Sequence, residues 1–469
     1  MKKVLQYAFG PIGAAALGLV TIPFVAWFFP VEDVGRLTML QLFLNLSAVF
    51  FSLSMYQSYV REYHEVADKV ILFKTSIVPG LLPLLAASLV VLLFSVPLSS
   101  YLFGIESYKL SLLVIVGTLS SYLIIFLTHV VRMQERAVAF SLTQLAPKLF
   151  LFTFIGLIFI IDIKADFTTL ILMETSALFL SLLVFSWLTR DTWLPALKVS
   201  TDRKLLNIML RFSLPLLLGS IAYKGLTAMD KLFLRSMSGL DELGIYAMAT
   251  TLAASVTVIS VVFSNVWHPT VYKWVKKGVD ADKIQQVIEC MVLFVATIWT
   301  FLGLLSWVFV CFLPEDYESI KYLVVACASM PLLYMLSETT VVGIGISRKT
   351  SYAMLASIVA FLANGVLNYF LIPKYGSSGA ALATLASFFI FFVVRTESSS
   401  ILWRSFPRWK IYIIVTLYSL ATAVMVLTKG ELPYISIMWS LLLVFTVSLF
   451  INRLIEFISF INIYILKRT

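Results

Sequence analysis

The sequence predicts an all-α polytopic membrane protein with about fourteen transmembrane helices, arranged as two parallel six-helix lobes followed by a C-terminal helix pair. Three observations predict this fold class. The composition is strongly apolar, apolar runs of about 20 residues follow one another along the whole chain, and a short motif recurs with matching helix spacing around it.

The composition indicates that lipid forms part of the solvent. Of the 469 residues, 60% are hydrophobic and 13% are charged, and the mean hydropathy is +0.97. An ordinary soluble domain carries about a quarter charged residues. The aromatic share of 14% suits lipid-facing surface and the Trp and Tyr belts found at membrane interfaces.

Several classes of function are disfavoured by what the sequence lacks. The net charge is +10, but no basic stripe with interleaved aromatic residues lies in a polar region, so nucleic acid is not expected as a partner. Cys290, Cys311 and Cys327 lie in or beside apolar runs, which disfavours a disulfide framework or a metal site. Nucleotide-binding, hydrolase and metalloprotease motifs are missing. We therefore expect no enzyme, no catalytic residue, no cofactor and no metal.

Each predicted span is long enough to satisfy its backbone polar groups inside a helix, which lipid requires. The first run is too long for the apolar part of a secretory signal, so we interpret it as an uncleaved span. The predicted spans are 8–29, 37–60, 76–96, 110–127, 140–161, 169–188, 212–235, 246–267, 291–313, 322–344, 352–372, 379–394, 411–427 and 434–451.

Basic residues predict the orientation of these spans. Lys and Arg are concentrated in alternate connecting segments, and such segments are retained on the cytoplasmic side. This pattern places both termini in the cytoplasm. Lys224 is the basic residue that the assignment leaves inside a span.

A repeat divides the chain into two blocks. The sequence Val-Glu-Asp-Val-Gly at 31–35 recurs as Leu-Asp-Glu-Leu-Gly at 240–244, and the two final glycine numbers differ by 209. The same shift superimposes the second and fifth spans of the blocks, although acidic-Gly turns also recur by chance. Because six is even, both blocks have one orientation, and a substrate cavity is expected between them. The predicted organisation is an N-terminal lobe, 1–190, a cytoplasmic linker, 191–211, a C-terminal lobe, 212–396, and appended helices with a cytoplasmic tail, 397–469.

A family resemblance covers essentially the whole chain. Its carrying segments are 10–35, Arg61-Glu62, Asp-Lys-Leu-Phe at 230–233, Leu-Gly-Ile-Tyr at 243–246 and Leu-Ile-Pro-Lys-Tyr-Gly-Ser-Ser-Gly-Ala-Ala at 371–381. In these segments the chain resembles the polysaccharide transporters of the multidrug/oligosaccharidyl-lipid/polysaccharide exporter superfamily, in particular the O-antigen and capsule-type flippases.

The resemblance implies a V-shaped, MATE-like fold and a transport function. A member of this family is expected in the bacterial inner membrane, where it carries undecaprenyl-pyrophosphate-linked oligosaccharide from the cytoplasmic to the periplasmic leaflet by alternating access. Its expected partners are this lipid-linked substrate, membrane lipids and the polysaccharide polymerase or export machinery. Many such flippases have twelve spans, so the extra helix pair leaves a lipid II-type flippase open. A drug or metabolite exporter of the same superfamily is the other alternative.

Basic and polar residues of the seventh span are candidate substrate-binding residues. A charge near the bilayer centre costs about 2.5 to 3.5 kcal/mol, so Lys224 should face a cavity or a partner. An ammonium suits a pyrophosphate head group. Lys231 follows two turns later on the same face, with Thr227 between them and Tyr223 beside Lys224. The alternative is that Lys224 forms an ion pair with Glu174 or Glu338.

The remaining candidates lie on other spans. Arg61 follows the second span at the cytoplasmic side, where it either meets the pyrophosphate or anchors the helix. Three carboxyl groups are candidates for proton or sodium coupling, namely those of Glu338, Glu174 and Asp230. Glu338 belongs to a polar patch that is predicted to lie deep in the tenth span. Hydrogen bonds between helices are the alternative for these carboxyl groups. Tyr223, Tyr246 and Tyr334 are weighed as residues that stack on sugars, with ordinary packing as the alternative.

Overall fold

The computed structural model describes residues 2–93, 98–161, 166–278, 281–347, 349 and 351–451, and these ranges contain helices and no strand. Eleven helices are long and apolar enough to cross a membrane, and two shorter apolar helices, Ile12–Phe28 and Ile435–Leu449, accompany them. One of the eleven, α16 (Ser351–Leu402), is two helices joined at Gly376. The protein is therefore a multi-pass membrane protein, as predicted.

The chain divides into two compact units, Met1–Ala228 and Met229–Thr469. The division falls inside one long helix, α10 (Arg203–Met237), which is the predicted seventh span. The predicted linker, 191–211, contains most of a short helix, α9 (Arg190–Ala196), and the first residues of α10.

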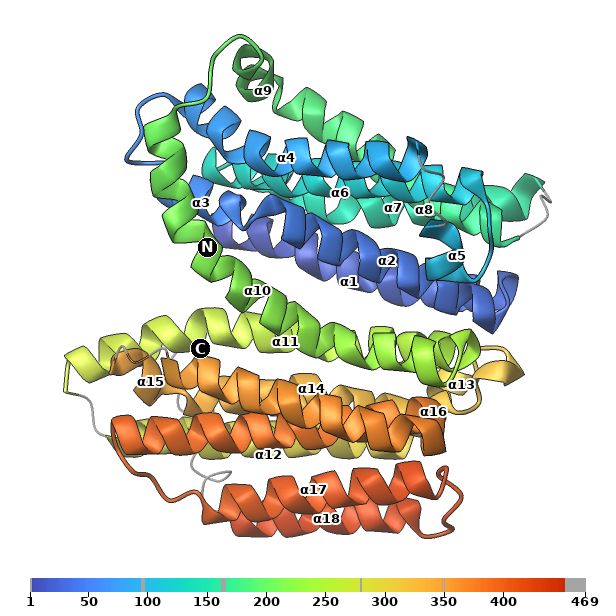
Figure 1. Cartoon of the computed structure of the whole chain (residues 1–469). Coiled ribbons are helices and arrows are strands. Elements are labelled where there is room, and N and C mark those ends of the chain that lie inside the picture. The colour runs from blue at the N-terminus through green and yellow to red at the C-terminus, as the bar shows by residue number, and fades with distance from the viewer. Residues whose placement is uncertain are drawn as a thin grey trace. The chain divides into compact units, whose positions relative to one another are not determined.

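The N-terminal unit is a bundle in which α1 packs on α7, α2 on α6, and α8 on both α6 and α7 (Figure 1). Aromatic residues fill its core, and the hydroxyl of the fully buried Tyr122 donates a hydrogen bond of 2.5 Å to the backbone carbonyl of Ile77. The helices that precede α9 and α10 are α1 (Lys2–Phe28), α2 (Val31–Ser52), α3 (Met55–Glu62), α4 (Lys69–Leu93), α5 (Leu98–Phe103), α6 (Tyr108–Met133), α7 (Ala137–Ile161) and α8 (Phe167–Leu188).

The second predicted span is broken into α2 and α3. Leu53 and Ser54, between these helices, have φ values of 49° and 55°, in the left-handed region that side-chain-bearing residues rarely adopt. Gly80 of α4 lies against this break, because a Cβ atom at Gly80 would stand 1.9 Å from the carbonyl oxygen of Phe51. A glycine therefore lets α4 approach the interrupted helix closely.

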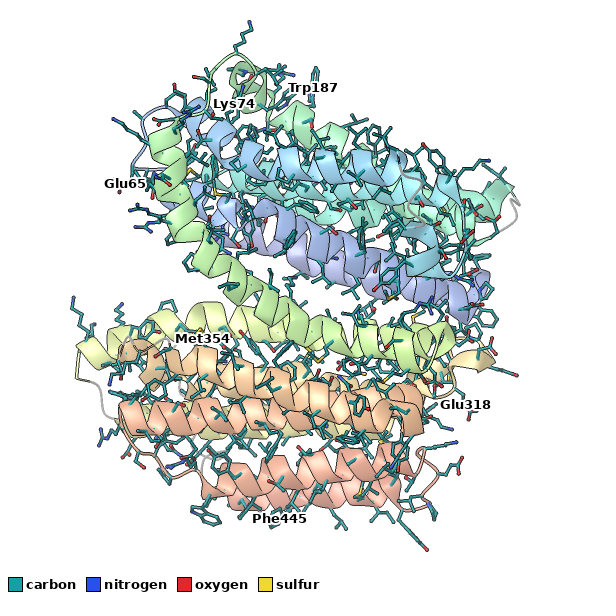
Figure 2. The ribbon with its side chains drawn as sticks, in the orientation of Figure 1. Glu65, Lys74, Trp187, Glu318, Met354 and Phe445 are labelled. Atoms are coloured by element: carbon teal, nitrogen blue, oxygen red, sulfur yellow. The ribbon has the colours of Figure 1, made fainter. Side chains whose placement is uncertain are left out.

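The C-terminal unit is centred on α14, which packs on α11, α12 and α16 and is buried along almost its whole length. Figure 2 shows Glu318 at the end of this unit that carries α13. Its helices after α10 are α11 (Leu240–Lys276), α12 (Ala281–Leu305), α13 (Trp307–Val310), a 3₁₀ turn at Glu315–Tyr317, α14 (Ile320–Thr340), α15 (Val342–Ile346), α16, α17 (Trp409–Leu427) and α18 (Ile435–Leu449).

The appended pair, α17 and α18, is fixed to α12 of the same unit. Trp439 of α18 is fully buried and packs beside Gly303 of α12. Two buried hydrogen bonds join α12 to α17, one of 2.9 Å from Trp299 Nε1 to Thr422 Oγ1 and one of 2.9 Å between the hydroxyls of Thr300 and Tyr418. The pair is therefore an integral part of the C-terminal unit.

Candidate functional site

The most polar cluster inside the C-terminal unit surrounds Asp230 of α10, whose exposed fraction is 4%. Its Oδ1 accepts hydrogen bonds of 2.9 Å from Asn364 Nδ2 and 2.7 Å from Asn368 Nδ2, both on α16. Its Oδ2 accepts a bond of 2.6 Å from the hydroxyl of Tyr246 on α11 and one from the hydroxyl of Thr384, beyond the kink of α16. Three helices therefore converge on one carboxylate.

The donors that surround Asp230 are all neutral. Among the described residues no Lys, Arg or His side chain lies within ion-pair distance of this carboxylate. Lys231, the next residue in sequence, is half-buried and interacts electrostatically with Asp230. Asp230 therefore combines neutral hydrogen-bond donors with one nearby ammonium group.

The atoms beside this carboxylate suit a hard cation. Asn368 Oδ1 is buried without a hydrogen-bond partner, and Asn364 Oδ1 accepts a bond of 3.0 Å from Asn368 Nδ2. Amide, hydroxyl and carboxylate oxygens are the ligands that hard cations prefer. Within the described ranges no group of three or more His, Cys, Asp or Glu residues is arranged to hold a metal ion. The cluster therefore has a single formal negative charge from Asp230.

Sequence reasoning named Asp230 as a coupling candidate but missed Asn364, Asn368 and Thr384. The spacing of four between the two asparagines places both on one face of α16, and this was the available signal. Tyr246, which we weighed as a sugar-stacking residue, is buried and bound to Asp230. The other such candidate in this unit, Tyr334, stacks on Phe391 with ring centroids 6.3 Å apart, so both tyrosines take packing or hydrogen-bonding roles.

Glu338 already has an arginine and a histidine as partners, which favours the interhelical alternative over ion coupling. Its Oε1 lies 2.7 Å from Arg395 Nη1 and its Oε2 lies 2.8 Å from His268 Nε2. It is not deep in its span, because α14 ends two residues later at Thr340. Arg395, which the sequence assignment placed in a loop, lies inside α16 and also donates to Ser337 Oγ over 2.9 Å. Glu338 thus joins α11, α14 and α16.

Glu174 of α8 lies in a small polar pocket of the N-terminal unit. It is 9% exposed, and its Oε1 accepts a hydrogen bond of 3.0 Å from Gln41 Nε2 on α2. The pocket has a volume of about 210 Å³ and is also lined by Asn45 and Lys148. Lys148 lies within α7. We predicted that Lys224 is the basic residue left inside a span, and this prediction is wrong because Lys148 also lies inside one.

Lys224 is exposed on α10, and no ion pair among the described residues includes it. Glu174 instead accepts from Gln41, and Glu338 pairs with Arg395. Thr227 is half-buried, and its hydroxyl donates to the carbonyl of Lys224 over 3.0 Å. The side chain of Tyr223 lies outside the described residues. An unpaired ammonium in a membrane helix requires water or a polar ligand.

Arg61 lies at the end of α3, with 57% of its side chain exposed. Its guanidinium stacks on the ring of Phe212 at 4.2 Å from the centroid, and its Nε lies 3.6 Å from Glu62 Oε1. An exposed ion pair of this kind contributes little to stability. The anchoring role and the phosphate-binding role both remain compatible with this position.

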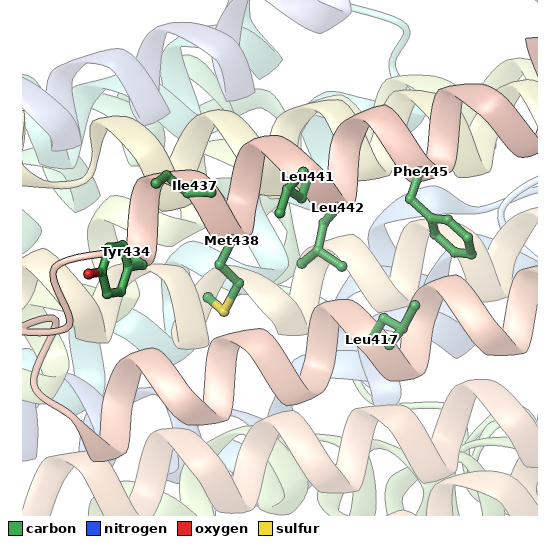
Figure 3. A pocket seen from close by; sticks show the side chains of 7 residues that line it. All are labelled: Leu417, Tyr434, Ile437, Met438, Leu441, Leu442 and Phe445. Atoms are coloured by element: carbon green, nitrogen blue, oxygen red, sulfur yellow. The ribbon is translucent and has the colours of Figure 1, made fainter.

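An apolar groove with a volume of about 470 Å³ runs between α17 and α18. Figure 3 shows Leu417 of α17 opposite Leu442 and Phe445 of α18. The other side chains that line the groove are Tyr434, Ile437, Met438 and Leu441. The groove can therefore accept a hydrocarbon chain, with the hydroxyl of Tyr434 as the polar group in its lining.

Comparison with known proteins assigns the family. A family model described as "Polysaccharide biosynthesis protein" matches residues 1–275, more than half of the chain. The chain belongs to this polysaccharide biosynthesis protein family. No curated protein matches the sequence.

Solved structures with the same fold are membrane transporters. The structure titled "Lipid II flippase MurJ, inward closed conformation" has a TM-score of 0.65 and 16% identity, with 96% of this chain and 100% of that chain covered. An inward-facing multidrug resistance MATE family transporter has a TM-score of 0.57 and 14% identity, with 83% and 95% covered. An outward-facing one has a TM-score of 0.54 and 15% identity, with 85% and 95% covered. The MATE-like fold is thereby confirmed.

Proposed function

We propose that this protein is a flippase that moves undecaprenyl-pyrophosphate-linked oligosaccharide from the cytoplasmic to the periplasmic leaflet of the bacterial inner membrane. The observation that carries the proposal is the exposed ammonium of Lys224, which has no ion pair among the described residues although it lies within the predicted seventh span, thirteen residues before the end of α10. A pyrophosphate head group would neutralise it during passage. Family membership in polysaccharide biosynthesis supports a glycan cargo.

The apolar groove between α17 and α18 fits the lipid part of such a cargo. Its lining is aliphatic and aromatic apart from the hydroxyl of Tyr434. The protein would act by alternating access and without covalent chemistry, with both termini in the cytoplasm.

Asp230 is the residue that best fits coupling to an ion gradient. It is buried, it is surrounded by neutral donors from α11 and α16, and Asn368 Oδ1 beside it has no partner. Entry of Na⁺ would recruit these oxygens as ligands, whereas entry of a proton would neutralise the carboxylate directly. Either event changes the hydrogen bonds that join three helices.

Two alternatives remain for the cargo. A lipid II-type substrate fits the same charge and the same groove, and the structural neighbour titled as a lipid II flippase has this fold. A cationic drug is disfavoured by the unpaired Lys224, since such a ligand would prefer a carboxylate in its path. Partnership with the polysaccharide polymerase or export machinery belongs to the same proposal.

Transport by the purified protein tests the proposal. Liposomes that contain the protein and lipid-linked oligosaccharide in one leaflet should show transfer of the glycan to the other leaflet, measured as its new accessibility to an impermeant glycosidase. Liposomes without protein and liposomes with Lys224→Ala protein are the controls. Transfer at the protein-free rate, with ethidium transported instead, would identify a drug exporter and end the flippase proposal.

A further inference from the structure

The polar pocket of the N-terminal unit lies between three helices of the same lobe. Gln41 and Asn45 come from α2, Lys148 comes from α7 and Glu174 comes from α8. Its volume of about 210 Å³ exceeds that of several water molecules, each of which occupies about 30 Å³ in the liquid. It is therefore large enough for one sugar ring.

Lys148 lies at the middle of a membrane-spanning helix. It is eleven residues from the first residue of α7 and thirteen from the last, which places it about 16 and about 20 Å from the two ends. Its side chain is half-buried, and among the described residues it has neither a hydrogen-bond partner nor an ion pair. Snorkelling to an interface from this depth would require a side chain several times longer than that of lysine.

The pocket cannot face hydrocarbon at acceptable cost. Its exposed rim carries Asn45, and its wall carries the ammonium of Lys148 and the carboxylate of Glu174. Each charged side chain at this depth costs about 2.5 to 3.5 kcal/mol in contact with lipid. The pocket must therefore open onto water or onto a polar ligand.

The groups in the pocket are complementary to a polyhydroxylated ring. The ammonium of Lys148 is a pure donor, the carboxylate of Glu174 is a pure acceptor, and the amide of Asn45 supplies both functions. Gln41 occupies one oxygen of Glu174 and leaves the other free for a ligand hydroxyl. A sugar presents alternating donors and acceptors on each hydroxyl, whereas a simple anion would be repelled by Glu174.

The pocket and the Asp230 cluster use helices at matching places in the two blocks, but their polar residues do not match. The pocket lies on α2, α7 and α8, and the cluster lies on the corresponding helices α11 and the two halves of α16, together with α10. Thr384 follows Glu174 by 210 positions, one more than the offset of the repeated motif. The offset takes Lys148 to Ser357, whose hydroxyl bonds within its own helix. The ammonium of Lys148 is therefore a feature of the first block alone.

We propose that the N-terminal pocket is a glycan subsite that holds one sugar residue of the cargo. Lys148 and Asn45 donate to ring or hydroxyl oxygens of this residue, and Glu174 accepts from one of its hydroxyls. The inference rests on the proposed function and adds a determinant of which oligosaccharide is carried. Lys148 and Glu174 are then specificity residues, whereas Lys224 serves the pyrophosphate common to all such cargoes.

Binding to two lipids that differ only in the glycan tests this subsite. The protein is placed in nanodiscs of phosphatidylcholine, whose head group has no free hydroxyl, and its thermal midpoint is measured with undecaprenyl pyrophosphate and with lipid-linked oligosaccharide extracted from source cells that lack the protein. Lys148→Met and Glu174→Gln are the test variants. Lys109→Met, which removes an exposed ammonium outside the pocket, is the matched control.

The expected result is that the test variants lose affinity only for the lipid that carries the glycan. The wild-type protein and Lys109→Met should bind the glycosylated lipid more tightly than undecaprenyl pyrophosphate. The test variants should bind the glycosylated lipid about tenfold more weakly than the wild type does. This loss of affinity corresponds to one hydrogen bond to a charged group. The affinity of the test variants for undecaprenyl pyrophosphate should not change. An equal loss for both lipids, or for neither, would overturn the subsite. If neither lipid stabilises even the wild type, the proposed function fails and the subsite fails with it.

Discussion

The carboxylate of Glu242 accepts a hydrogen bond of 2.7 Å from the backbone N–H of Ser377, which joins the first turn of α11 to the kink inside α16. Gly376 at this kink has φ of +53° and lies so close that a Cβ atom would stand 2.5 Å from Glu242 Oε2. The repeated acidic-Gly motif and the segment 371–381 therefore meet in space. Glu242 caps the first N–H groups of the helix that begins after the kink.

Gly376→Ala should destabilise the C-terminal unit by about 1 to 3 kcal/mol, because alanine is strained at positive φ and its methyl group would collide with Glu242. The fraction of protein that stays monodisperse after heating in detergent measures this effect. Gly219→Ala is the control, since nothing lies within 4 Å of a Cβ atom there and alanine favours the helix. Equal heat resistance of the two variants would show that the kink carries no such constraint.

Lys224→Ala should lower the transport rate of lipid-linked oligosaccharide by tenfold or more, because a charge-assisted hydrogen bond to phosphate contributes about 1.5 to 3 kcal/mol. Lys224→Arg should retain much of the rate, since it keeps the positive charge. Lys277→Ala, at an exposed position after α11, should transport as the wild type does. Normal export of surface polysaccharide by cells with Lys224→Ala at matched protein levels would remove Lys224 from the substrate path.

Asp230→Asn should uncouple transport from its driving gradient. Asparagine keeps the size of the side chain but removes the negative charge that would attract Na⁺ or a proton. The measurement is the flipping rate in proteoliposomes with an imposed Na⁺ or pH gradient, which should accelerate the wild type and leave the variant unchanged. Glu338→Gln serves as the comparison, and a gradient response lost there but kept in Asp230→Asn would transfer the coupling role to Glu338.

Glu338→Ala should destabilise the protein by about 3 kcal/mol, because it leaves the guanidinium of Arg395 buried without its counter-charge. The double variant Glu338→Ala with Arg395→Met should recover most of this loss, since both charges are then gone. Thermal midpoints of the single and double variants complete a double-mutant cycle. Strictly additive effects would mean that the observed ion pair contributes no coupling energy.

Hydropathy and repeat spacing were sufficient to predict the helices, because lipid leaves the backbone no alternative to internally satisfied helices. Hydropathy and repeat spacing did not predict the local backbone geometry. The break at Leu53 and Ser54 falls in an apolar stretch without glycine or proline, and Gly80 of another helix packs against it. The kink of α16 at Gly376 likewise lies against a residue distant in sequence, Glu242.

The candidate site was predicted only in part. The sequence indicates that a charged residue in the membrane needs a partner, but it does not indicate which residue is that partner. Lys224 and Asp230 were identified by their charge. Asn364 and Asn368 were not predicted, because they are uncharged, although both donate hydrogen bonds to Asp230. Lys148 lies in the middle of the predicted fifth span, 140–161, and was overlooked when the basic residues were assigned to loops. Arg395 was placed in a loop because it directly follows the predicted twelfth span, 379–394, and the partner of Glu338 was missed with it.

Burial of Trp439 against α12 determines which part of the protein can bear the hydrophobic tail of a cargo. Both helices that form the groove contact α12 of the C-terminal unit, α17 through two buried hydrogen bonds and α18 through Trp439. A long isoprenoid seated there would therefore stay with the C-terminal unit throughout the transport cycle, while the sugar at its far end changes sides.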